Sequence, residues 1–204
     1  MESILQHTIN KVKSRIFGHG RGWVFSPRHF SDLGSDSAVR TALSRLQKEG
    51  IIRRIAQGIY DFPRSHKSLG LLSPTVEFVA RAFAEKNAAQ IQASGAYAAN
   101  LIGLSEQVPG KVVFLTDGPS GRVTIEKLKI SFRKTTVRNM YAAGSKEALV
   151  IQAFKFMKEQ NIDRIMLKTT KKFLLGTPRK KLEKNLKFAP SWIRELLFDL
   201  MECE

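Results

Sequence analysis

The stretch that decides the N-terminal fold runs from Ser35 to Phe62. It reads SDSAVRTALSRLQK over residues 35–48 and GIIRRIAQGIYDF over residues 50–62. Within the first segment, Val39, Leu43 and Leu46 recur at i, i+4 and i+7, which places them on one face of a helix. The opposite face carries long basic donors and short hydroxyls, with no carboxylate among them: Ser37, Arg40, Thr41, Ser44, Arg45 and Lys48.

The second segment predicts a basic hairpin. A short strand bears Arg53 and Arg54, and a Gln57-Gly58 turn leads into a second short strand. Because side chains alternate along a strand, only one of the two arginines can face outward. A helix with a basic, hydrogen-bonding face followed by a basic hairpin is typical of a winged helix-turn-helix that grips DNA. The candidate DNA contacts are therefore Ser37, Arg40, Thr41, Ser44, Arg45, Lys48, Arg53 and Arg54.

The residues before this stretch supply the remaining elements of such a domain. Apolar residues at helical spacing predict a helix over 4–17, starting at Ile4, and Trp23–Phe25 can form a short strand. Ser26-Pro27 has the character of an N-cap followed by proline at the first helical position, which predicts a helix over Pro27–Asp32. The order helix, strand, helix, turn, helix, hairpin predicts a winged helix-turn-helix DNA-binding domain over residues 1–64.

The rest of the chain predicts a different organisation. Residues 65–74 are mostly polar or small and are interpreted as a linker, and residues 75–204 as an α+β domain. We expect helices over 75–86, 95–101 and 146–160, and strands over 89–93, 111–116 and 122–134, the last divided at Lys127-Leu128. A basic helical extension starts at about residue 161, with breaks at 176–178 and 189–191. The predicted class is α+β, a winged helix-turn-helix followed by a mixed α/β domain with a helical tail.

Charge points to polyanionic partners. The net charge is +16 and the isoelectric point about 10.2, which favours DNA, RNA or an anionic membrane surface. Residues 1–64 hold eleven Lys/Arg against five Asp/Glu, so most of the excess lies beyond them. That excess could follow a nucleic-acid backbone, face an acidic protein, or simply be a solvated helical face. A second basic surface is predicted from Arg133, Lys134, Arg138, Lys168, Lys171, Lys172, Arg179, Lys180 and Lys181.

Several classes of function lack support in the sequence. The single cysteine, Cys203, cannot form an internal disulfide, which favours a reducing compartment. No secretory signal is apparent in MESILQHTINKVKSRIF and no window is apolar enough to span a bilayer, so we expect a cytoplasmic protein without a membrane partner. The four histidines have no companions at metal-ligand spacing, and no nucleophile–base pair is found. We therefore expect no enzyme activity, no metal and no cofactor.

Two blocks of the chain resemble a known family, the AbiEi-like antitoxins of type IV toxin–antitoxin (abortive infection) systems. The N-terminal block comprises Trp23–Pro27 with Phe30, Val39–Leu46, Gly50–Arg54 and Gly58–Tyr60; the second comprises Ser94–Leu104, Gln107–Pro109 and the strand Val112–Thr116. The resemblance covers residues 1 to about 160 and does not extend to the basic tail after Arg164. It implies a bacterial repressor of its own operon whose C-terminal domain opposes a nucleotidyltransferase toxin encoded alongside.

Three interpretations follow and do not exclude one another. The first is a sequence-specific repressor that binds double-stranded promoter DNA, with pairing on an inverted repeat. The second makes binding of the toxin by the C-terminal domain the main task. The third is an RNA-binding or nuclease module that uses the basic segment Arg164–Lys187, and the absence of an acidic cluster for metal ions disfavours the nuclease.

Overall fold

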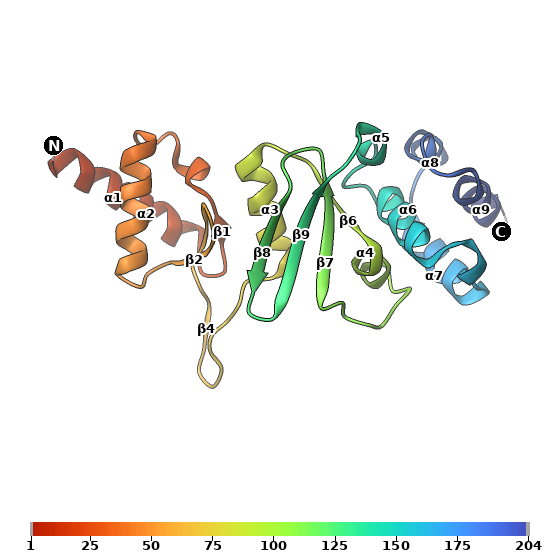
Figure 1. Cartoon of the computed structure of the whole chain (residues 1–204), viewed down its shortest axis with the longest axis horizontal. Coiled ribbons are helices and arrows are strands. Elements are labelled where there is room, and N and C mark those ends of the chain that lie inside the picture. Colours follow the sequence, from red (N-terminus) through yellow and green to blue (C-terminus); the bar gives the residue numbers. More distant parts are fainter. Residues whose placement is uncertain (1, 203–204) are drawn as a thin grey trace. The chain divides into compact units, whose positions relative to one another are not determined.

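The first unit of the molecule is organised around two helices that pack on each other. The computed structural model describes the backbone of residues 2–202 and the side chains of residues 5–202 (Figure 1). The expectations that concern Cys203 and the side chain of Ile4 therefore lie outside the described residues. Overall, 51% of the chain is helical and 18% is strand, which is a mixed α+β fold. The chain divides into two compact units, Met1–Ala89 with Val123–Lys127, and Gln90–Arg122 with Leu128–Glu204.

The helical core of the first unit follows the predicted periodicity. Helix α1 (Glu2–His19) packs against α2 (Asp36–Lys48), and the buried face of α2 consists of Val39, Ala42, Leu43 and Leu46. The Ser35 side chain caps α2 by accepting a hydrogen bond from the Ala38 amide at 3.3 Å. Around them a single apolar cluster includes Val12, Phe25 and Phe30, all fully buried.

The helix expected over Pro27–Asp32 is shorter than predicted and of a different type. The segment forms a four-residue 3-10 helix, η1 (Pro27–Phe30), with Ser26 in the N-cap position. Only a few residues separate this cap from Gly34, so there is room for little more than one turn before the chain reverses. Such single turns commonly adopt the tighter 3-10 geometry. Arg15 fastens this region to α1 through paired bonds of 2.6 and 2.7 Å to the Asp32 carboxylate, which lower the pKa of Asp32 to about 2.

A three-stranded antiparallel sheet completes this part of the first unit. Its order is β1 (Val24–Phe25), β3 (Ile59–Asp61), β2 (Arg53–Ala56), so the middle strand is the last in sequence. The pairing of β2 with β3 shifts register between Arg54 and Ala56. The expected Gln57-Gly58 turn joins the two strands, and Gly58 has a φ of +67°, which side-chain-bearing residues rarely adopt.

The units divide the chain at a different place from the predicted boundary at residues 65–74. This segment forms a small hairpin of β4 (Ser65–His66) and β5 (Gly70–Leu71). The following helix α3 (Val76–Asn87) packs on β1, β3 and η1, and its Glu85 carboxylate lies 2.9 Å from His29 Nε2. Helix α3 therefore belongs to the first unit, and its buried side is formed by Val79, Ala80, Ala82 and Phe83.

A four-stranded mixed sheet of order β6-β7-β9-β8 follows, in which the end of β8, residues 123–125, is grouped with the first unit and the rest with the second. The strands are β6 (Ile91–Ser94), β7 (Lys111–Thr116), β8 (Gly121–Ile125) and β9 (Leu128–Lys134), so the division expected at Lys127-Leu128 is present one residue earlier, at 126–127. Strand β6 runs antiparallel to β7, whereas β7 and β9 are parallel. Helix α4 (Gly95–Leu101) follows β6 directly and packs on α6 (Lys146–Met157).

The tail is helical, as expected, and closes a second apolar core. After α5 (Val137–Met140) and α6 come η2 (Glu159–Asn161), α7 (Arg164–Leu174), α8 (Arg179–Leu186) and α9 (Ser191–Glu202). The predicted breaks at 176–178 and 189–191 separate these last three helices. Phe154, Leu174, Leu186, Ile193 and Leu197 are completely buried in the shared core. None of the helices in the described chain is both long enough and apolar enough to cross a bilayer.

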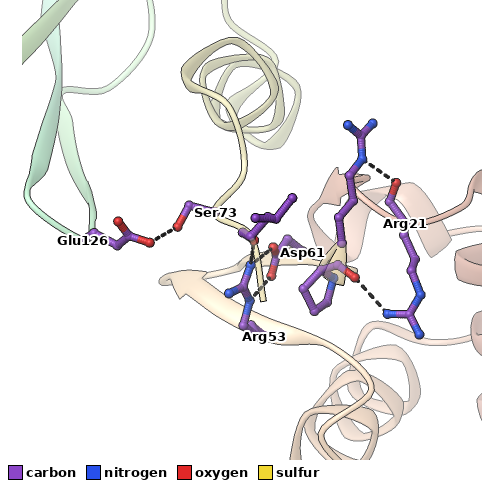
Figure 2. Close-up of polar contacts among 8 residues, drawn as sticks. Arg21, Arg53, Asp61, Ser73 and Glu126 are labelled. Carbon is purple, nitrogen blue, oxygen red and sulfur yellow. Dashed lines mark hydrogen bonds and ion pairs between the residues drawn. The ribbon is translucent and has the colours of Figure 1, made fainter. Parts of the chain in front are cut away.

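A buried ion pair holds the N-terminal sheet together (Figure 2). Arg53 on β2 donates to the Asp61 carboxylate on β3 at 3.1 and 2.6 Å, and to the Leu72 carbonyl at 2.7 Å. The Asp61 side chain is only 1% exposed, so its charge depends on Arg53 for compensation. Ser73 follows Leu72 directly, and its hydroxyl donates to the Glu126 carboxylate.

Removing one member of the Arg53–Asp61 pair should destabilise the fold. Arg53→Met leaves a buried carboxylate without its cation, and we expect the free energy of unfolding to fall by about 3 kcal/mol, at the low end for a broken buried pair because Arg53 is partly exposed. Urea denaturation measures this change. The double variant Arg53→Met/Asp61→Leu removes both charges and should recover most of the loss; a double variant as unstable as the single would contradict this account.

Candidate nucleic-acid interface

The outer face of α2 carries the side chains that the sequence assigned to it. Ser37, Arg40, Thr41, Ser44, Arg45 and Lys48 are all exposed, opposite the buried row of Val39, Leu43 and Leu46. The side chains of this face differ in how firmly they are held, however. Thr41 donates its hydroxyl hydrogen to the Ser37 carbonyl at 2.9 Å, and Arg45 bonds to Glu49 at 3.3 Å and to Gln6 on α1 at 3.1 Å.

Arg53 and Arg54 have separate roles. Arg53 is directed inward, onto Asp61 and the Leu72 carbonyl, whereas Arg54 is exposed on the other side of β2. Strand alternation produces this separation. Because both oxygens of the Asp61 carboxylate already bond to the Arg53 guanidinium, we assign Arg53 to the fold and keep Arg54 in the candidate interface.

Arg40 and Arg54 line the same hollow. This hollow, about 550 Å³ in volume, lies among the start of η1, the first turns of α2, the β2–β3 turn and the end of α3. Four cations line it, namely Arg28, Arg40, Arg54 and Lys86; of its lining residues in the described structure, only Asp36 is acidic. The other lining groups include Ser26, Ser31 and Tyr60, whose hydroxyls are hydrogen-bond donors. We name it the N-terminal cationic hollow.

Lys86 ties the hairpin turn to α3. Its ammonium donates to the Gln57 carbonyl at 2.6 Å, and a side-chain carbon built on Gly58 would lie 3.2 Å from Lys86 Cε. Burial lowers the pKa of Lys86 below its ordinary 10.5, and the positive charge of Arg54 lowers it further. Two cations that repel each other beside a hollow create a local potential that attracts an anion.

Sequence reasoning missed Arg28 and Lys86. Arg28 follows the Ser26-Pro27 cap and carried no periodic signal of its own. Lys86 lies on α3, which the predicted boundary assigned to the other region. Only the packing of α3 on β1 and β3 brings Lys86 to the hairpin turn, so no local pattern could have identified it.

The predicted second basic surface is spread over several elements of the second unit. Arg133 and Lys134 are on β9, Arg138 is on α5, Lys168, Lys171 and Lys172 are on α7, and Arg179, Lys180 and Lys181 are on α8. Arg133 and Arg138 line different hollows. Arg179 bonds to Glu183 at 3.1 Å and to Glu202 at 2.9 Å, which neutralises part of the charge on α8.

A model of one protein family matches residues 11–185, a span that includes α2, the hairpin, α3 and the whole sheet of the second unit. The chain belongs to the DUF6088 family. That family is described as one of unknown function. A search of curated proteins finds no match. The match to DUF6088 thus extends over both units.

Lys86 should control the rigidity of the β2–β3 turn. Lys86→Met keeps most of the aliphatic stem but removes the ammonium that bonds to Gln57, so we expect amide hydrogen exchange at Gly58 and Ile59 to accelerate on the order of tenfold. Lys67→Met, a change of an exposed lysine between β4 and β5, is the matched control and should leave this exchange unaltered. Equal exchange rates in the Lys86 variant and the native chain would contradict a bracing role.

Proposed function

We propose that residues 1–64 form a winged helix-turn-helix and that this DUF6088 protein is a transcriptional repressor that binds double-stranded DNA. The order α1, β1, η1, α2, β2, β3 and the antiparallel sheet β1-β3-β2 support the proposal. So does the outer face of α2, which is exposed and free of carboxylates over the residues named above. The second helix of such a motif enters the major groove while other parts contact the backbone.

The N-terminal cationic hollow is the observation that carries this proposal. A phosphate that passed between α2 and the β2–β3 turn would meet Arg40, Arg54 and Lys86. Arginine forms charge-assisted bonds with phosphate oxygens, and the exposed hydroxyl of Ser31 can add a further donor. In this arrangement the hollow holds the backbone and fixes the register of α2, while Ser44 and Arg45 reach base edges.

The side chains of Arg45 and Thr41 differ in their capacity to form new hydrogen bonds with DNA. Arg45 is held by exposed partners, Gln6 and Glu49, and bonds between exposed groups exchange readily with water and ligand. Its guanidinium is therefore available to a guanine edge. Thr41 Oγ1 already donates its hydrogen to the helix backbone and can only accept a further bond. We accordingly rank Arg40 and Arg45 above Thr41 as DNA contacts.

The biological part of the proposal is autoregulation within a type IV toxin–antitoxin system. It rests on the resemblance of residues 94–104 and 107–116, together with the N-terminal block, to AbiEi-like antitoxins. In that interpretation the second unit opposes a nucleotidyltransferase toxin, and the repressor pairs on an inverted repeat of its own promoter.

Binding to DNA should depend on the N-terminal cationic hollow. We expect Arg40→Gln/Arg54→Gln/Lys86→Gln in the full chain to weaken duplex binding and to reduce the slope of log K against log salt by about 0.9, the contribution of the one phosphate held in the hollow. Fluorescence anisotropy over a salt series measures both. The matched control Lys11→Gln/Lys67→Gln/Arg81→Gln removes three exposed positive charges of the same unit that do not line the hollow. An equal reduction in the control would show only a general charge effect and would contradict the proposed interface.

The antitoxin part of the proposal predicts that a neighbouring gene encodes the nucleotidyltransferase toxin that this chain opposes. Co-expression of the chain with the product of a neighbouring nucleotidyltransferase gene should restore growth that the nucleotidyltransferase alone inhibits. The triple variant of the hollow should lose promoter repression in a reporter assay yet still restore growth, because the toxin is opposed by the second unit. Continued growth inhibition in the presence of the native chain would contradict the antitoxin role and leave the DNA-binding proposal standing.

A further inference from the structure

A second collection of cations lies on one face of the sheet in the second unit. Strands β7 and β9 are parallel, and their register pairs Lys111 with Lys129, Val113 with Ser131 and Leu115 with Arg133. Residues two apart on a strand share a face, so Lys111, Lys129 and Arg133 lie on the same side of the sheet. Phe114 and Phe132, paired on the opposite side, are buried, whereas the three cations are exposed.

This face borders a hollow of about 560 Å³. Its lining includes Lys111 from β7, Arg122 from β8 and Arg133 from β9, together with Ser120 and Ser131; Phe132 also lines it but is only 1% exposed. The described lining contains no carboxylate. The Ser120 hydroxyl accepts a hydrogen bond from the Lys134 amide at 3.1 Å, which holds the β8 start beside the β9 end and keeps Arg122 near Arg133.

Such an arrangement is unfavourable for the isolated protein. Like charges directly opposite each other on neighbouring strands destabilise a sheet, and Lys111 and Lys129 occupy such a pair. In the described structure neither lysine, nor Arg122, nor Arg133 forms an ion pair with an acidic side chain. An anionic ligand that spans the face would supply the missing counter-charge and relieve the repulsion.

The chemistry of the face selects among anionic ligands. Sheet surfaces that bind single-stranded nucleic acid use exposed aromatic side chains to stack bases, and the face formed by Lys111, Lys129, Ser131 and Arg133 has none. Guanidinium, ammonium and hydroxyl groups instead match phosphate oxygens. Lys129 and Arg133 are four residues apart, which is about 13 Å along a β-strand. A length of about 13 Å of the B-form helix axis contains about four phosphates of each DNA strand.

We propose that this sheet face, defined by Lys111, Arg122, Lys129 and Arg133, binds the phosphate backbone of duplex nucleic acid without regard to its sequence. It is a second site, in a different unit from the N-terminal cationic hollow, and it does not depend on whether α2 reads bases. Contacts with phosphates position a protein on a duplex but carry no sequence information.

The test compares charge-removal variants of the full chain. We expect Lys111→Gln/Arg122→Gln/Lys129→Gln/Arg133→Gln to weaken binding to an arbitrary-sequence DNA duplex on the order of tenfold or more at low salt. The salt slope should fall by about 3.6 if each cation holds one phosphate. The control Lys146→Gln/Lys155→Gln/Lys158→Gln/Arg194→Gln removes the same charge from positions on or next to α6 and on α9, outside the sheet face and outside the predicted second basic surface, and should leave the slope nearly unaltered. Equal slopes for the sheet variant and the native chain, or an equal reduction in the control, would overturn the proposal.

Two further measurements distinguish a loss of duplex binding from a loss of folding. The melting temperature of the sheet variant at low salt should be unchanged or raised, because the variant removes like-charge repulsion. In the native chain, a bound duplex should slow acetylation of Lys111 and Lys129 relative to Lys168, measured by mass spectrometry. Equal acetylation rates with and without duplex, or protection by polyglutamate but not by duplex, would assign the face to another partner and overturn the proposal.

The outcome separates this proposal from the proposed function. If the sheet variant loses salt dependence while the Arg40/Arg54/Lys86 variant does not, the sheet site is supported and the winged-helix interface is contradicted. The reverse result contradicts the sheet site alone. When both sites bind the same duplex, the two variants combined should lose the sum of the two slope changes.

Discussion

The buried Arg53–Asp61 pair is the interaction on which the N-terminal unit depends. It joins β2 to β3, and through the Leu72 carbonyl it also holds the chain that leads into α3. The hydrogen bonds made by one arginine therefore hold together the sheet and the approach to α3. Since neighbouring residues on a strand face opposite sides, engaging Arg53 inside leaves Arg54 outside. Because of the ion pair, Arg54 and not Arg53 is the arginine of the hairpin that can contact a ligand.

The packing of α3 also restrains the β2–β3 hairpin. The helix packs on β1, β3 and η1, and its Lys86 bonds to the β2–β3 turn. The turn itself needs a glycine, because Gly58 has a positive φ and because Lys86 leaves little room for a side chain. A short hairpin is flexible in isolation. Here one charged hydrogen bond from a different element, donated by Lys86 to Gln57, restrains the turn before any ligand arrives.

The excess positive charge is distributed in two structurally different ways. On α8, Arg179 is compensated by Glu183 and Glu202, and the exposed charges there resemble an ordinary solvated helix face. In the N-terminal cationic hollow and on the β7–β9 face, cations adjoin cations with few or no carboxylates. Repulsion of this kind opposes folding, so its concentration in two hollows distinguishes them from the rest of the basic surface.

The local signals of the sequence determined a large part of the fold. Apolar spacing in residues 35–48, the Gln57-Gly58 turn, the division near Lys127-Leu128 and the breaks at 176–178 and 189–191 each depend on neighbours a few residues apart, and each is present. The Ser26-Pro27 cap predicts a helix to Asp32, whereas the structure has only the 3-10 turn Pro27–Phe30, because cap residues mark where a helix starts, not how far it extends. Tertiary structure alone decided that α3 belongs to the first unit, that Arg53 is internal, and that Lys86 joins Arg40 and Arg54. These outcomes depend on contacts between residues far apart in the chain, and such contacts leave no periodic trace in the sequence.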